Sequence, residues 1–484
     1  MTPPHTQALR GSNFAQPTVP ASPAGSTAAP RPAFYLTMVF VFVVYARFPE
    51  IMDMVMGSAV HSVRIIMVLA LLAVLLFGGT IRAVFSPVGV CLLAFTVWLC
   101  VCTPFSVWRG GSFRTLQDFW AISLFSFVII ASSVQGLEQC RKIMYSFAAA
   151  TIFIESVALT MGRVQAGRLA LVGGTLGNAN DLAMILLMGA PFCLFVIRTR
   201  PGKSFLKLAC AAMAVFIPAT VATTGSRGGL VILAVIFILY FLPLPAVQKI
   251  GVAVGALILA VFAITWSTRS ALDRYRTMFH SSDQAQLSES ERSAMDSTEL
   301  RRELLRSSLQ LTMRHPLLGV GPGMFEVANA GYTEETTGRA SFNAWHETHN
   351  TFTQLSCEDG LPGLFLYCLA LLFCFKIVRS VEKRARSYPA LSAVRHMAFA
   401  LRLALIAFTG TAIFSSNAYM YYFPMLAAFC VVLDRTTAEL FSSQAAPVSG
   451  QPDTMRQAVK TLARFRPGTL HGSRAMAWKR PPSG

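Results

Sequence analysis

The sequence predicts an all-α polytopic membrane protein with about 12 transmembrane helices and one large outer loop. Only 13% of the 484 residues are charged and 54% are hydrophobic, whereas soluble globular proteins carry about 25% charged and about 45–50% apolar residues. The mean hydropathy is +0.54. A chain of this composition has too little polar surface to cover a water-soluble domain.

The excess of basic residues does not indicate a nucleic-acid-binding protein. Lys and Arg number 41 against 23 Asp and Glu, a net charge of +18. That balance would suggest nucleic acid on one soluble domain, but apolar runs interrupt the charge throughout. The ten cysteines show no metal or disulfide spacing, and most lie in apolar stretches, where cysteine behaves as a small hydrophobe.

Twelve apolar segments are expected to be spans, with boundaries good to a few residues. They lie near residues 34–53, 61–79, 86–104, 117–135, 142–161, 181–198, 206–223, 229–245, 250–267, 362–379, 397–415 and 419–434. The first nine fall within 33–267 and the last three within 351–434. The polar stretch 268–350 between them is the large loop.

Two polar tails flank the spans. Residues 1–32 are rich in Pro, Ala, Ser, Thr and Gly, so they are expected to be a disordered tail. They lack the charged start, short apolar core and cleavage site of a signal peptide, so no processing is expected. Residues 435–484 form a basic tail suited to a solvated position near anionic lipid.

The lysines predict the orientation of the chain. With a cytoplasmic N-terminus and twelve crossings, all lysines fall on the cytoplasmic side, as the positive-inside rule requires. These are Lys142, Lys203, Lys207, Lys249, Lys376, Lys383, Lys460 and Lys479. Both termini are then cytoplasmic, and the large loop faces the periplasm if the membrane is a bacterial inner membrane.

The arginines do not follow the lysines. Those expected on the outer side are Arg109, Arg114, Arg163, Arg168, Arg227, Arg301, Arg302, Arg306 and Arg314. Such cations oppose the insertion bias and therefore need another explanation. They either pair with loop carboxylates or form a shared anionic site, because the guanidinium fork matches phosphate oxygens.

Two outer turns combine glycine with polar residues. Gly173–Asp181 directly precedes a predicted span, so its amides lead into a helix N-terminus that favours anions. The segment is equally well explained as a plain loop and helix cap. In Thr224–Gly229, small residues flank Arg227, which either approaches a lipid head group closely or snorkels to the interface.

The large loop begins its motif region with a predicted amphipathic helix on the membrane face. Leucines between Leu300 and Leu311 recur at roughly helical spacing, with arginines among them, and His315–Pro316 ends the helix. The glycines of Gly319–Gly323 then allow a tight turn that could pass close to a substrate.

A second loop motif contains two histidines, His346 and His349, with Glu347 between them. A zinc site would need a third ligand at convincing spacing, and none is present. An interfacial histidine can also simply bond a carbonyl. The functional interpretation is a neutral imidazole that acts as a general base, since its pKa near neutrality suits proton transfer.

In this order, the motifs resemble those of the O-antigen ligase and O-antigen polymerase superfamily, polytopic glycosyltransferases that use polyprenyl-pyrophosphate-linked glycans. Members typically show an Asn-Pro-Asn segment, a Ser-Arg-Gly turn, an Arg-led loop helix, a His-Pro-Leu-Leu-Gly-Val-Gly-Pro-Gly run and a His-Asn motif followed by Glu-x-Gly. The similar residues here are Asn178–Asn180, Ser226–Gly228, Arg301 onward, His315–Gly323, His349–Asn350 and Glu358 with Gly360. Ala179, Leu305 and Phe352 depart from the common residues.

This resemblance implies transfer of a glycan from a polyprenyl-pyrophosphate donor, without cofactor or metal. We assign His349 as the base, Arg227 and Arg301 as the preferred pyrophosphate clamps, and Arg168 and Arg302 as secondary clamps. The supporting motif residues are Asn178, Asn180, Ser226, Gly321, Gly323, Asn350 and Glu358. The implied partners are the lipid-linked donor, a lipid A-core or glycan acceptor, and membrane lipids.

Other functions compete with this one. A polymerase of the same superfamily shares every motif and differs only in its acceptor, which could also be a protein side chain. A multi-span transporter would favour ionisable residues near the midplane, whereas the charges here avoid the span centres. A non-catalytic assembly partner of an envelope complex is the third alternative.

Overall fold

The computed structural model describes residues 31–56, 62–77, 84–165, 167–171, 175–266, 275, 289–338, 345–388 and 391–445. The chain up to Thr437 forms one unit, and the chain from Ala438 onward forms a second. Nearly all of the predicted N-terminal tail lies outside the described residues, as does the C-terminal tail beyond residue 445. The helix that contains the last predicted span continues to Ala445, so it extends past the expected start of the tail.

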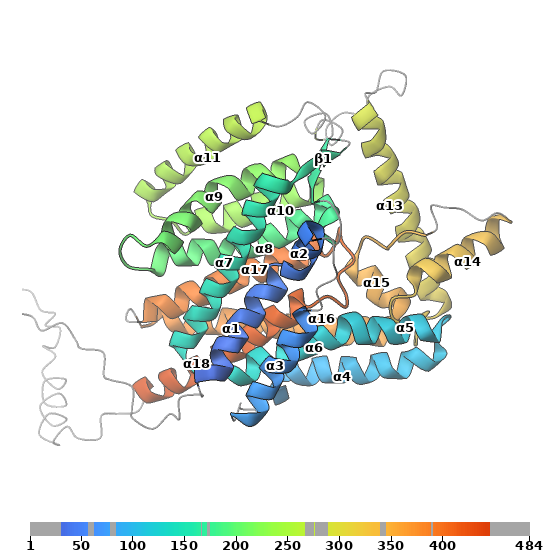
Figure 1. The fold of residues 1–484 in the computed structure, drawn as a ribbon, viewed down its shortest axis with the longest axis horizontal. Coiled ribbons are helices and arrows are strands. Elements are labelled where there is room, and N and C mark those ends of the chain that lie inside the picture. The colour runs from blue at the N-terminus through green and yellow to red at the C-terminus, as the bar shows by residue number, and fades with distance from the viewer. Residues whose placement is uncertain are drawn as a thin grey trace, which may run out of the picture. The chain divides into compact units, whose positions relative to one another are not determined.

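The described chain is helical apart from its connections and one short hairpin (Figure 1). The helices of the first half are α1 (Arg31–Tyr45), α2 (Phe48–Met56), α3 (Ser62–Leu76), α4 (Pro87–Cys102), α5 (Arg109–Thr115), α6 (Ala121–Ser133), α7 (Leu137–Met161), α8 (Ala179–Thr199), α9 (Phe205–Thr223), α10 (Arg227–Phe241) and α11 (Ala246–Trp266). Those of the second half are α13 (Glu289–Arg314), α14 (Phe325–Thr337), α15 (Thr351–Glu358), α16 (Gly360–Arg386), α17 (Ser392–Thr411) and α18 (Tyr422–Ala445). The strands β1 (Arg163–Gln165) and β2 (Arg168–Ala170) pair antiparallel.

Within the described residues, seven helices are long and apolar enough to cross a membrane. They are α4 with the following turn to Phe105, α5 with α6, and α7, α8, α9, α16 and α17. The pair α1–α2 is bent by 60° and brings the number to eight if it is one span. The apolar parts of α3, α10 and α11 are shorter than a full crossing requires. The structure therefore supports a polytopic all-α protein, while twelve spans remain a prediction.

Helix α8 lies at the centre of the bundle, where it contacts α7, α9, α10 and α17. Its apolar window is 72% buried, against 28% for α9. The rings of Phe147 and Phe192 stack between α7 and α8 with centroids 4.7 Å apart, a geometry that adds to the apolar burial. The N-terminus of this central helix is consequently held firmly by its neighbours.

The helix predicted in the large loop is confirmed as α13, which ends at Arg314 directly before His315–Pro316. It runs crosswise to α4 and packs against α14 and α15 (Figure 1). Leu305, Leu309 and Met313 are exposed at a spacing of four residues, so they share one face of the helix. The sequence did not predict α14, whose polar composition resembles that of a loop.

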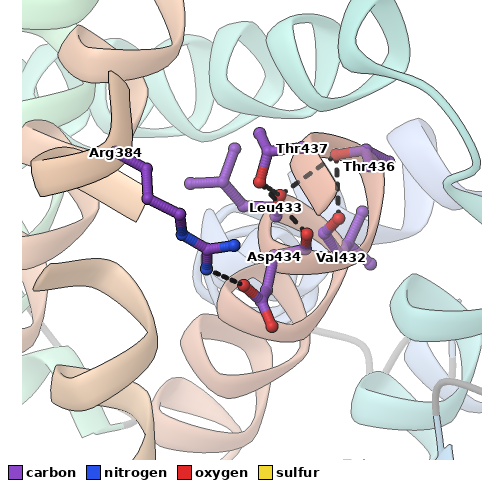
Figure 2. Close-up of polar contacts among 6 residues, drawn as sticks. All are labelled: Arg384, Val432, Leu433, Asp434, Thr436 and Thr437. Atoms are coloured by element: carbon purple, nitrogen blue, oxygen red, sulfur yellow. Dashed lines mark hydrogen bonds and ion pairs between the residues drawn. The ribbon is translucent and has the colours of Figure 1, made fainter. Parts of the chain in front are cut away.

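Far along the chain, α16 and α18 are joined by an ion pair (Figure 2). Arg384 donates to the Asp434 carboxylate at 3.0 Å, with both side chains about 40% exposed (41% and 39%). The hydroxyls of Thr436 and Thr437 instead donate to carbonyls one turn back in α18. An exposed pair of this kind contributes about 0–1 kcal/mol, so it adds little to the stability of the contact between these helices.

Candidate active site

A cavity of about 340 Å³ brings several of the predicted residues together. Its walls come from β1–β2, from the start of α8, from α13 and from the residue that precedes the α15 cap. The polar residues in its lining are Gln165, Arg168, Asn178, Asn180, Ser297, Arg301 and His349. Residues far apart in the sequence therefore form one polar, concave site.

The start of α8 forms one wall of the cavity. Asn178 is the N-cap, and its side chain accepts from the Asn180 amide at 3.0 Å. Capping of this kind is worth about 1 kcal/mol and fixes where the helix begins. The Asp181 amide of the same turn donates to the Asn178 carbonyl at 3.1 Å, and the positive end of the helix dipole lies at this wall of the cavity.

Arg168 reaches the cavity from β2, next to the turn of the hairpin. Its Nη2 donates to Asn180 Oδ1 at 2.9 Å, and its Nε donates to the Thr224 carbonyl at 3.2 Å. The guanidinium is thus oriented by α8 on one side and by the α9–α10 turn on the other. A fork oriented in advance loses less entropy when it binds phosphate.

Arg227 is the first residue of α10, after the N-cap Ser226, whose hydroxyl accepts from the Gly229 amide at 3.2 Å. Its Nη2 donates to Thr298 Oγ1 of α13 at 2.5 Å. Thr298 is adjacent to Ser297 and one turn before Arg301, both of which line the cavity. Arg227 therefore supports the α13 wall and is not itself part of the lining.

The two neighbouring arginines of α13 point in different directions. Arg301 lines the cavity, whereas the Arg302 side chain is 70% exposed and pairs with Glu299 at 3.5 Å. Adjacent residues cannot share a helix face, so the helical phase separates them. The structure does not place Arg302, a predicted secondary clamp, at the site.

His349 lies at the cavity in an unusual backbone conformation, with a φ of 52°. Burial lowers the pKa of its imidazole to about 4, with help from the positive charges of Arg301, His346 and Arg168. The ring is consequently neutral at physiological pH. The near-neutral pKa expected from the sequence is therefore wrong for this histidine, because burial and nearby cations disfavour its protonated form. The neutral ring can still accept a proton while Arg168 and Arg301, in the same cavity lining, attract an anion.

The glycine-rich turn packs against its neighbours in the structure, and its approach to a substrate remains a prediction. The Gly323 and Phe325 amides donate to the Glu358 carboxylate at 3.1 and 3.0 Å, and Tyr419 donates to it at 2.8 Å. A Cβ on Gly321 would lie 2.0 Å from Ser106 Oγ. Glu358, buried at this junction, has a pKa raised to about 7. None of these residues lines the cavity.

The histidine motif shows no metal cluster in the part of the chain that the structure describes. There, no group of three or more His, Cys, Asp or Glu side chains could hold a metal ion. Asn350 instead caps α15, because its side chain accepts from the Phe352 and Thr353 amides at 2.9 and 3.1 Å. This cap anchors the chain directly after His349.

Sequence reasoning missed the segment between α17 and α18. Ser415 donates to the Asp181 carboxylate at the start of α8, and Thr351 Oγ1 donates to the Ser415 carbonyl at 2.7 Å. The polar run Ser415-Ser416-Asn417 between two predicted spans was the available signal. The apolar residues around it place the predicted spans at 397–415 and 419–434, so only a short gap remains and it does not stand out as a loop.

One known protein family matches the middle of the chain. Residues 211–368 match the family model described as O-antigen ligase, which confirms the resemblance read from the motifs. The match includes Arg227, Arg301, His349 and Glu358, while Arg168 and Asn178 precede it. No curated protein matches the chain. The family and the apolar helices together indicate a multi-pass membrane protein of glycosyltransferase type.

Proposed function

Because residues 211–368 match the family model described as O-antigen ligase, we propose that this chain is a membrane glycosyltransferase of the ligase type. It moves a glycan from a polyprenyl-pyrophosphate donor to an acceptor hydroxyl at the outer face of a bacterial inner membrane. The donor already carries a good leaving group at its anomeric carbon, so neither a nucleotide nor ATP is required.

The observation that carries this proposal is the cavity in which neutral His349 lies with Arg168 and Arg301. Pyrophosphate gains negative charge as it leaves the sugar, and guanidiniums oriented in advance stabilise that charge most in the transition state. The acceptor hydroxyl must lose a proton at the same time. One cavity therefore contains the two kinds of group that a direct displacement needs: cations for the leaving pyrophosphate and an acceptor for the hydroxyl proton.

In the proposed reaction, the acceptor oxygen attacks the anomeric carbon and the bond from that carbon to the pyrophosphate oxygen breaks. The electron pair of the broken bond goes to the pyrophosphate, which Arg168 and Arg301 neutralise. The hydroxyl proton goes to a ring nitrogen of His349. A single displacement of this kind inverts the anomeric centre, and the arginines supply the positive charge that a metal could otherwise provide.

Arg227 takes a supporting part in this proposal, since it holds α13 beside Ser297 and Arg301. Arg302 has no part in it, because its side chain is exposed and paired with Glu299. The outer location rests on the lysine distribution, which favours cytoplasmic termini.

The acceptor separates the ligase from its closest alternative. A lipid A-core acceptor defines a ligase, and a second lipid-linked glycan defines a polymerase of the same superfamily. The family description favours the ligase. A transporter would move the lipid-linked glycan without forming a new glycosidic bond, so the chemical product separates it from both enzymes.

The test uses purified protein in proteoliposomes with a radiolabelled polyprenyl-pyrophosphate glycan and either acceptor. His349→Ala abolishes transfer, and Arg301→Ala lowers it roughly ten- to a hundredfold, because a charge-assisted hydrogen bond contributes about 1.5–3 kcal/mol. Arg306→Ala is the matched control, since Arg306 is exposed on the same helix. Normal transfer by His349→Ala would remove the base assignment, and an unchanged glycan with wild-type protein would refute the proposed function.

A further inference from the structure

The backbone of His349 needs an external constraint. Its φ of 52° lies in the left-handed region, which residues with a Cβ adopt only rarely. A side chain on such a backbone points in a direction that the local sequence alone does not maintain. The contacts of the residues on either side therefore decide where the imidazole lies.

Residues before and after His349 bind the segment between α17 and α18. Before His349, the Thr348 and Ser416 hydroxyls are hydrogen-bonded at 3.0 Å. After His349, the Thr351 amide donates to the Ala412 carbonyl at 2.8 Å. The Thr351 hydroxyl donates to the Ser415 carbonyl at 2.7 Å and accepts from the Asn417 amide at 3.0 Å.

The bonds of Thr351 are shielded from water, which makes them effective constraints, whereas Ser416 is half-buried. Thr348 is 4% exposed and Thr351 is fully buried, while Ser415 and Asn417 are each 4% exposed. A buried polar group that loses its partner is not rescued by solvent. Residues 412–417 therefore hold the chain on both sides of His349.

The same segment also contacts the opposite wall of the cavity. Ser415 donates to the Asp181 carboxylate in the first turn of α8, and Asn417 Nδ2 donates to Ser415 Oγ at 2.7 Å. Asn178 and Asn180, immediately before Asp181, line the cavity. One short segment thus contacts both the chain that carries His349 and the helix start that orients Arg168.

We infer that residues 412–417, through Thr351 and Ser416, position His349 against the α8 wall for glycan transfer. This inference rests on the proposed function. Thr351 and Ser416 are positioning residues, since they act on the reaction only through the histidine. Thr351 follows the His349–Asn350 pair within the histidine motif but has no role assigned from the sequence, and Ser416 lies outside the motifs.

The kinetic test compares Thr351→Ala with Thr351→Ser, which keeps the hydroxyl. A misplaced base lowers the rate at saturating donor about ten- to a hundredfold, whereas the KM for the donor stays unchanged because the arginines remain in place. Thr351→Ser restores most of the rate. Thr409→Ala in α17 is the matched control, since its hydroxyl donates to Leu405 of its own helix at 2.8 Å.

The pH profile distinguishes positioning from general loss of structure. In Thr351→Ala the imidazole gains water, so the acidic limb of the rate profile moves to higher pH. A merely structural role lowers the amount of active protein and leaves the limb where it is. Ser416→Ala provides a milder version of the same change if Thr351→Ala does not fold.

An assay without catalysis tests the positioning directly. The thiol introduced by H349C is alkylated with a membrane-impermeant maleimide, and the labelling of the parent chain is subtracted. Adding Ser416→Ala or Thr351→Ala accelerates this alkylation, while Thr409→Ala does not. Wild-type rates, pH profiles and alkylation rates in both positioning variants would overturn the inference. Absent transfer by the wild-type chain, with alkylation accelerated as expected, would refute the proposed function alone.

Discussion

If His349 is the base, glycan transfer should continue at a pH where an ordinary histidine is already protonated. The perturbation is a pH series from 8 to 4.5, applied to the wild-type chain and to Arg301→Gln. Burial and the charges of Arg301, His346 and Arg168 all lower the pKa of His349. They disfavour the protonated ring, so the neutral and active form persists as the pH falls.

The size of the effect follows from the pKa. At pH 5.5, a histidine with the usual pKa of about 6.5 is roughly one-tenth neutral. His349, with its pKa lowered to about 4, is almost entirely neutral at the same pH. The wild-type rate at pH 5.5 should therefore stay close to its value at pH 7.5, whereas an ordinary histidine would lose about nine-tenths of it.

Arg301→Gln removes one of the charges that disfavour protonation. The pKa of His349 then rises toward its usual value, and the half-maximal point of the normalised acidic limb moves to higher pH. The assay is the initial rate of labelled glycan transfer at saturating donor, with protein integrity checked at each pH by recovery of activity at pH 7.5. A wild-type limb centred near pH 6.5 would refute the argument, as would an unshifted limb in Arg301→Gln.

Two further predictions concern residues outside the cavity lining. Arg227→Lys should lower transfer about tenfold, because lysine cannot reproduce the guanidinium geometry that binds Thr298 and holds α13 beside Arg301; initial rates in membranes with matched protein levels test this, and wild-type rates would make Arg227 a simple interfacial anchor. Gly321→Ala should destabilise the chain by at least about 1–3 kcal/mol, since Gly321 has a φ of 108° and its Cβ would meet Ser106. Thermal unfolding in detergent measures this loss. An unchanged midpoint would show that Ser106, which precedes α5, does not constrain the turn.

The features that sequence reasoning predicted well are local. Asn178 as a helix cap and His315–Pro316 as a helix end follow from the chemistry of one or two residues, and the structure confirms both. Apolar runs long enough to span gave most of the bundle. The predicted span 229–245 extends past the end of α10 at Phe241, because the apolar composition continues into residues that are no longer helical.

The features that the sequence does not predict depend on three-dimensional placement. Arg301 and Arg302 are equivalent in a motif, and only the packing of α13 decides which one reaches the cavity. The glycines of the loop turn were assigned to substrate because close approach is what glycine permits, whereas the neighbour that approaches Gly321 is Ser106. The bonds from Thr351 to Ser415 join residues on either side of two long helices, which no local pattern encodes.

The origin of those bonds has a consequence for the biosynthesis of the protein. Chains are made from the N-terminus onward, so His349 leaves the ribosome before α16, α17 and the segment that fixes its backbone. A chain that stops after α17 has Arg168, Arg301 and His349, but the contacts from Ser415 and Asn417 are missing. The proposed glycan-transfer centre is therefore completed late, and a partly inserted chain carries His349, Arg168 and Arg301 without the contacts that position the histidine.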